Sequence, residues 1–123
     1  MVDQSILIVE DDKCNRDLIS DILDLEGYYI DTAIDGEEAL RKTKNKKYEL
    51  IILDIKLPKL NGCDLLSEFR KCPETKNTPI IVLTAHAMRG DKEKFESLGC
   101  DEYLSKPIDV TKFTKVVNNY VKA

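Results

Sequence analysis

Three short runs of consecutive apolar residues, at positions 6–9, 50–53 and 80–83, constrain the fold of this chain more than any other feature. Each run has the length of a strand and is too short for a buried helix. Apolar residues without alternation indicate a strand covered on both faces, which is typical of parallel sheets packed between helices. The runs therefore predict an α/β domain built on a parallel sheet.

The segments between these runs have the periodicity of helices. Apolar residues recur at helical spacing from Leu18 to Leu25, and Gly27 predicts the end of that helix. Asp35 and Glu38 have the spacing of a capping box, so a second helix is expected to begin there. Further helices are expected over residues 63–71, 89–97 and 110–121, the last one capped by Asp109 with Phe113, Val116, Val117, Tyr120 and Val121 facing inward.

Two more strands, at residues 28–33 and 101–104, mix polar and apolar residues, so they are expected at the edges of the sheet. Right-handed crossovers with helices on both faces then fit a single doubly wound sheet of order 2-1-3-4-5, which is the flavodoxin-like fold. The sequence alone does not order the three central strands. A chain of 123 residues is expected to form one domain, over residues 1–123.

The composition argues against several kinds of function. With 42% hydrophobic and 34% charged residues and no signal-peptide pattern, the chain is expected to be soluble and cytoplasmic. A net charge of −4 disfavours nucleic acid and acidic membranes as partners. The basic run at residues 41–47 is expected to be a solvated helix end, with a small docking patch as the alternative. The four cysteines form no Cys-x-x-Cys pair and are expected to be reduced thiols.

Polar residues follow the predicted strands, and in a parallel sheet the carboxyl ends of all strands lie at one edge. Glu10 and Asp11 follow the first strand, Asp54 ends the third, Thr84 ends the fourth, and Lys106 follows the fifth. Two carboxylates about 4 Å apart repel each other by about 4 kcal/mol at an effective dielectric constant of about 20. An all-oxygen cluster of this kind suits a hard divalent cation, above all Mg²⁺.

Together these groups predict a phosphoryl-transfer site in which Asp54 is the nucleophile, Lys106 supplies a cation and Thr84 a hydrogen bond. The chain has no glycine-rich phosphate loop, so ATP bound by this domain is not the expected donor. Each residue also has a structural explanation by itself, and for Asp12 we favour helix capping. Coincidence at four strand ends is the weaker explanation for the set.

The chain resembles a response-regulator receiver domain, the phosphoacceptor part of two-component signalling, over essentially its whole length. The resemblance rests on residues 6–12, 53–58 followed by Asn61-Gly62, 83–85 and 103–107. It implies that Asp54 accepts phosphate from a phosphohistidine on a sensor histidine kinase or a histidine phosphotransfer protein. It also implies contacts of Thr84 and Lys106 with the phosphoryl group. The ligands that it implies for Mg²⁺ are Glu10, Asp11, Asp54 and the backbone carbonyl of Lys56.

The resemblance extends to residues around the site. Tyr103 matches an aromatic switch that moves inward as Thr84 is drawn toward the phosphate, and the peptide before Pro107 is commonly cis. Lys56 and His86 match variable positions that tune phosphoryl lifetime. The segment at residues 85–91 is similar to single-domain regulators of the cell-division or chemotaxis type, and equally to receivers fused to hybrid kinases.

Two other classes of protein stay open as alternatives. A haloacid-dehalogenase phosphatase also uses a strand-end aspartate and Mg²⁺, but it needs a second aspartate where this chain has Lys56. A flavodoxin-like binding module needs glycine and hydroxyl residues after the first strand, where this chain has acids at residues 10–12. Since the last helix ends near Ala123, we expect no output domain, and a signal carried by changed partner binding rather than enzyme turnover. A receiver cut from a larger protein would have the same sequence pattern.

Overall fold

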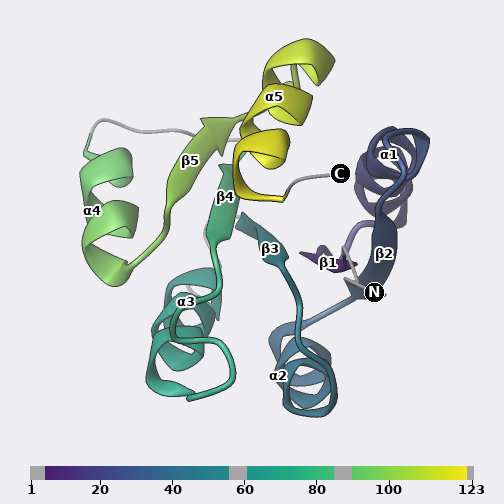
Figure 1. Cartoon of the computed structure of the whole chain (residues 1–123). Coiled ribbons are helices and arrows are strands. Elements are labelled where there is room, and N and C mark those ends of the chain that lie inside the picture. The colour runs from purple at the N-terminus through teal and green to yellow at the C-terminus, as the bar shows by residue number, and fades with distance from the viewer. Residues whose placement is uncertain (1–4, 56–60, 85–89, 122–123) are drawn as a thin grey trace.

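The computed structural model describes residues 5–55, 61–84 and 90–121, which form a central sheet between two layers of helices (Figure 1). The strands in this part of the chain are β1 (Ser5–Val9), β2 (Tyr29–Ala33), β3 (Leu50–Ile55), β4 (Ile80–Thr84) and β5 (Glu102–Ser105). The helices are α1 (Lys13–Leu25), α2 (Gly36–Asn45), α3 (Asn61–Lys71), α4 (Asp91–Leu98) and α5 (Val110–Tyr120).

All neighbouring strands are parallel, and their order is β2-β1-β3-β4-β5. Side chains of β1 and β4 are buried along the whole strand, whereas β2 and β5 are partly exposed at the edges. One core cluster packs α2, α3 and α4 against one face of the sheet, and a second packs α1 and α5 against the other. The predicted fold class, strand order and edge strands are therefore confirmed.

Aspartate side chains cap the N-termini of three of the helices, where each accepts a backbone N–H that the first turn leaves unpaired. In α2 the carboxylate of Asp35 accepts the N–H of Glu38 at 2.8 Å. Glu38 in turn accepts the N–H of Ile34 at 2.7 Å. In a standard capping box it would accept the N–H of the N-cap residue itself, Asp35. Asp12 caps α1 and Asp109 caps α5, as expected.

Some predicted helix boundaries were wrong. Helix α3 begins at Asn61, so the pair Asn61-Gly62 belongs to the helix and not to the preceding loop. Helix α4 covers Asp91–Leu98, and its glycine cap at Gly99 is confirmed. Leu18 and Leu25 belong to the predicted helical repeat, but they are 51% and 86% exposed, because the buried side of α1 is the narrower stripe of Ile19, Ile22 and Leu23.

Candidate functional site

The register of the central strands brings Glu10 and Asp54 together at the carboxyl edge of the sheet. Val9 pairs with Leu53, so the residues that follow, Glu10 and Asp54, are neighbours on adjacent strands. By the two-residue period of strands, both lie on the face that also carries Ile8 and Ile52. The side chains of Glu10 and Asp54 are both fully buried.

Lys106 joins this pair from the end of β5. Its backbone N–H donates to the carbonyl of Thr84 at 2.8 Å, which continues the ladder between β4 and β5 beyond Ser105. Its Nζ lies against Asp54 Oδ2 and 3.4 Å from Glu10 Oε1, and the Lys106 side chain is only 15% exposed. The Lys106–Pro107 peptide is cis, as the resemblance implied.

The ammonium of Lys106 compensates only in part for the two buried carboxylates. Burial raises the pKa of the Asp54 carboxyl above its usual range, and the neighbouring Glu10 carboxyl raises it further. The Lys106 ammonium acts in the opposite direction but does not cancel these effects. Asp54 Oδ1 is buried and has no hydrogen-bond partner among the described residues, so this carboxylate retains an oxygen for a further ligand.

The loop from β1 to α1 is held by side chains on both of its sides. Glu10 Oε2 accepts the N–H of Asp12 at 3.1 Å. Arg16 Nη1 donates to the carbonyls of Glu10 at 3.1 Å and Asp11 at 3.4 Å. Sequence reasoning missed Arg16, and the only signal was a cation near a helix N-terminus, where the dipole opposes it.

Thr84 and Asp11 also lie at this edge of the sheet. Thr84 is 2% exposed and ends β4, in register with Ile55 and Ser105. The strand period puts it on the opposite face of the sheet from Asp54. Asp11 is exposed. The structure thus brings the side chains of Glu10 and Asp54 into contact with Lys106. Thr84, on the neighbouring strand, is joined to Lys106 by a backbone hydrogen bond.

The donors available for a metal ion are carboxylate oxygens, which suit Mg²⁺. Within residues 5–55, 61–84 and 90–121, no three His, Cys, Asp or Glu side chains already converge as a metal site. Asp54 Oδ1, which has no hydrogen-bond partner within the described part of the chain and lies beside Glu10, nevertheless fits a hard cation. Lys56, predicted as a backbone ligand, and His86 lie outside the described residues.

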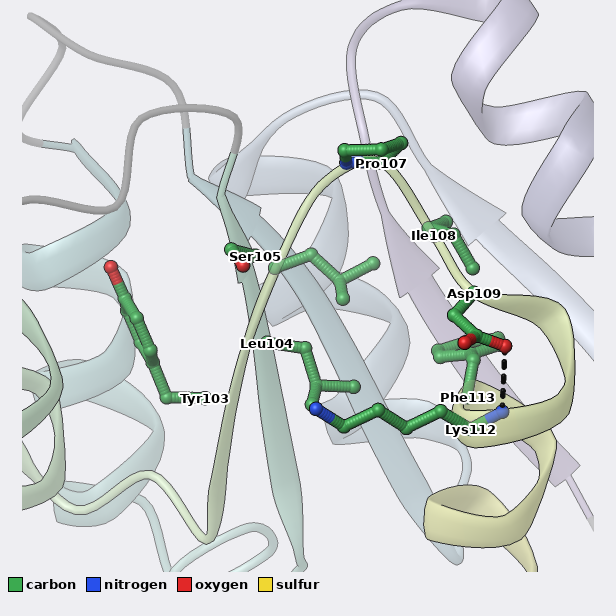
Figure 2. A pocket seen from close by; sticks show the side chains of 9 residues that line it. Tyr103, Leu104, Ser105, Pro107, Ile108, Asp109, Lys112 and Phe113 are labelled. Atoms are coloured by element: carbon green, nitrogen blue, oxygen red, sulfur yellow. Dashed lines mark hydrogen bonds between the residues drawn. The ribbon is translucent and has the colours of Figure 1, made fainter.

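Tyr103 lies on β5 and packs inward. Its ring stacks on Phe95 of α4, with centroids 5.6 Å apart, and its hydroxyl oxygen is buried. Figure 2 shows a hollow between β5 and α5, with the Tyr103 side chain directed away from Leu104 and Lys112. This hollow, of about 310 Å³, is lined partly by Ser105 and Pro107, the residues on either side of Lys106.

The sequence matches the response regulator receiver domain family over residues 6–118. The chain belongs to this family of receiver domains. It is therefore a signalling domain of two-component systems and not an enzyme that turns over a substrate. This family membership decides against the two alternatives, a phosphatase and a flavodoxin-like binding module. No helix among the described residues has the length and apolar character needed to span a membrane.

Relatives of this receiver domain match it almost from end to end. The polar-differentiation response regulator DivK of Brucella anthropi is 35% identical over 96% of both chains. The receiver domain of the sensor histidine kinase PA1611 of Pseudomonas aeruginosa, solved with a magnesium ion in its active site cleft, is 32% identical with a TM-score of 0.86, covering 99% of this chain and 100% of that one. The response regulator TrrA of Thermotoga maritima, solved with Mg²⁺-BeF, is 36% identical with a TM-score of 0.83, covering 96% and 99%.

Proposed function

We propose that Asp54 is the phosphoacceptor of this receiver domain and takes its phosphoryl group from a phosphohistidine. The donor would be a sensor histidine kinase or a histidine phosphotransfer protein. The observation that carries the proposal is the buried carboxylate at the end of central strand β3, with one oxygen against Lys106 and the other without a hydrogen-bond partner among the described residues. A nucleophile held by a central strand is fixed in direction while one oxygen is available to form a bond.

In the proposed reaction, an electron pair of the Asp54 carboxylate forms the oxygen–phosphorus bond. The phosphorus–nitrogen bond of the donor breaks, and its electron pair stays on the imidazole nitrogen. Lys106 already lies against Asp54, so its ammonium can stabilise charge on the transferred oxygens. Thr84, whose carbonyl anchors the backbone of Lys106, would donate its hydroxyl to a phosphoryl oxygen.

The residues proposed to hold Mg²⁺ are Glu10, Asp11, Asp54 and the backbone carbonyl of Lys56. When bound, Mg²⁺ would neutralise charge that develops on the phosphoryl oxygens. The contribution of the chain is to keep Glu10 buried beside Asp54, partly through the bond from Asp12 N–H to Glu10 Oε2. The magnesium-bound relatives support this assignment by analogy.

We further propose that the phosphorylated domain signals by changing which protein binds to the surface of α4, β5 and α5. Thr84 and Tyr103 lie on the same face of the sheet by strand period, and Tyr103 packs on Phe95 of α4. A shift of Thr84 toward Asp54 would change the packing available to Tyr103. The hollow between β5 and α5 is lined by Ser105 and Pro107, which flank Lys106 in the sequence (Figure 2).

Incubation with acetyl phosphate and Mg²⁺ tests the assignment of Asp54. We expect intact-mass spectrometry to show one added phosphoryl group in the wild-type protein and none in Asp54→Asn. The matched control is Asp109→Asn, because asparagine caps a helix as well as aspartate and α5 should stay folded. Retention of the adduct in Asp54→Asn, or its loss in Asp109→Asn alone, would contradict the proposal.

A further inference from the structure

Arg16 is in the first turns of α1 but makes its contacts with the loop before the helix. Its Nη1 donates to the carbonyl oxygens of Glu10 and Asp11, at 3.1 and 3.4 Å. Its backbone N–H donates to the carbonyl of Asp12 at 2.9 Å, within the first turn. A single half-buried residue therefore connects the helix to the backbone of both acids that follow β1.

A cation at this place is not explained by helix stability. The N-terminal end of a helix carries partial positive charge, which disfavours arginine in the first turns. Lys13, one turn earlier, shows the ordinary alternative: it is exposed and pairs with Asp17 at 2.8 Å, away from the loop. Arg16 instead uses Nη1 for two successive carbonyls, and this nitrogen lies one bond farther from the helix backbone than the Nζ of a lysine would.

We propose that Arg16 is a positioning residue for the reaction at Asp54, because it fixes the backbone of Glu10 and Asp11 and so sets where their carboxylates point. This inference rests on the function proposed above. The two acids repel each other and Asp54, so without an anchor the loop would relax to separate them. Residues that orient metal ligands without touching the metal typically contribute about 10- to 100-fold to metal affinity.

The sign of the effect separates positioning from simple electrostatics. Removing a positive charge near a cation site should tighten Mg²⁺ binding if charge alone matters. If Arg16 positions the acids, Arg16→Gln should instead weaken Mg²⁺ binding by about tenfold. Arg16→Lys keeps the charge, but its Nζ is one bond closer to the helix backbone and reaches the two carbonyls less well, so this variant should also bind Mg²⁺ more weakly than wild type.

Mg²⁺ titration by isothermal calorimetry, at constant ionic strength, measures the affinity directly. The matched control is Lys13→Gln, which removes a charge one turn away without touching the loop, and we expect unchanged or slightly tighter binding. The half-saturating Mg²⁺ concentration for phosphorylation by acetyl phosphate should rise in both Arg16 variants, while saturating Mg²⁺ restores most of the adduct. Circular dichroism verifies folding, and Arg16→Lys serves as the conservative variant if Arg16→Gln is unstable.

Each outcome decides the inference. Tighter or unchanged Mg²⁺ binding in the Arg16 variants, with normal phosphorylation of the wild-type protein, would overturn the role of Arg16 and leave Asp54 as phosphoacceptor. Equal weakening in Lys13→Gln would show an effect of charge or helix stability rather than positioning. Failure of the wild-type protein itself to bind Mg²⁺ or take up phosphate would overturn the proposed function, and this inference with it.

Discussion

Gly99 and Arg70 should be energetically coupled, because each occupies space that the other needs. Gly99 caps α4 with a φ of +111°, and a Cβ built there would lie 2.8 Å from Arg70 Cγ and 2.9 Å from its Nε. Arg70 cannot easily give way, since its Nε donates to the Gly99 carbonyl at 2.8 Å and its Nη1 to the Thr78 carbonyl at 2.7 Å. Its Nη2 also pairs with Asp101 at 2.9 Å.

The cost of Gly99→Ala has two parts that can be measured separately. An alanine at positive φ costs about 1–2 kcal/mol. Displacing Arg70 should add the loss of one or two of its hydrogen bonds, about 1 kcal/mol each. Gly27 supplies the control for the first part, because its φ is +91° and no atom lies within 4 Å of an added Cβ. We therefore expect Gly27→Ala to cost about 1–2 kcal/mol and Gly99→Ala about 2–4 kcal/mol.

Urea denaturation of the single variants and of the Arg70→Ala/Gly99→Ala pair gives the free energies of unfolding. In the Arg70→Ala background, Gly99→Ala should cost only what Gly27→Ala costs, because the crowding atoms are gone. Equal costs of Gly99→Ala in the two backgrounds would refute the reasoning. Arg70 bonds residues at the start of β4 and β5, opposite the site, so folded variants should still accept phosphate at Asp54.

Two further predictions concern ionisable groups. In EDTA at pH 8, Asp54→Asn should be more stable than wild type, because burial and Glu10 raise the pKa of Asp54 and so penalise its charged form. This difference in stability should shrink as the pH falls, since native Asp54 then binds its proton. Adding Mg²⁺ should stabilise only the wild type. Thermal melts at pH 8 and pH 5, with and without Mg²⁺, measure both effects. The pKa of Asp31 is lowered, chiefly by the hydrogen bond from the Tyr48 hydroxyl and then by Lys46. The Tyr48–Asp31 bond therefore stabilises the fold above the ordinary aspartate pKa of about 3.9, and this stabilisation is lost as the pH falls and native Asp31 is protonated. Tyr48→Phe should therefore destabilise more at pH 7 than at pH 3 in urea melts, and a pH-independent difference would contradict this.

The fold could be predicted because its signals are local and agree with one another. Continuous apolar runs can be buried only inside a sheet covered on both faces, and the intervening helices force parallel order. The errors arose where neighbours decide. The helical period of α1 includes Leu18 and Leu25, but which residues of that repeat are buried depends on how α5 and β2 cover the helix. The pair Asn61-Gly62 has turn preferences, which tertiary context overrode.

The site could be predicted only as far as strand ends define it. Glu10, Asp54 and Lys106 meet because their strands are in register, which the order of the sheet implies. The sequence did not reveal that Lys106 bridges both buried carboxylates, since it was equally compatible with an exposed lysine before a turn. Arg16 was missed because its acceptors are backbone carbonyls, which every residue has. The roles of these residues with Mg²⁺ and phosphate stay predictions.

Because alternate residues of a strand point to opposite faces of the sheet, the residues at this edge fall into two groups with different proposed roles. Glu10, Asp54 and Lys106 continue the face packed against α1 and α5, which carries the proposed chemistry. Thr84 continues the opposite face, where Tyr103 packs against Phe95 of α4. A phosphoryl group on Asp54 that recruits the Thr84 hydroxyl would have to draw a residue of one face toward the other across the end of the sheet. The same backbone bond that joins Lys106 to Thr84 would then link the reacting face to the face where partners are proposed to bind.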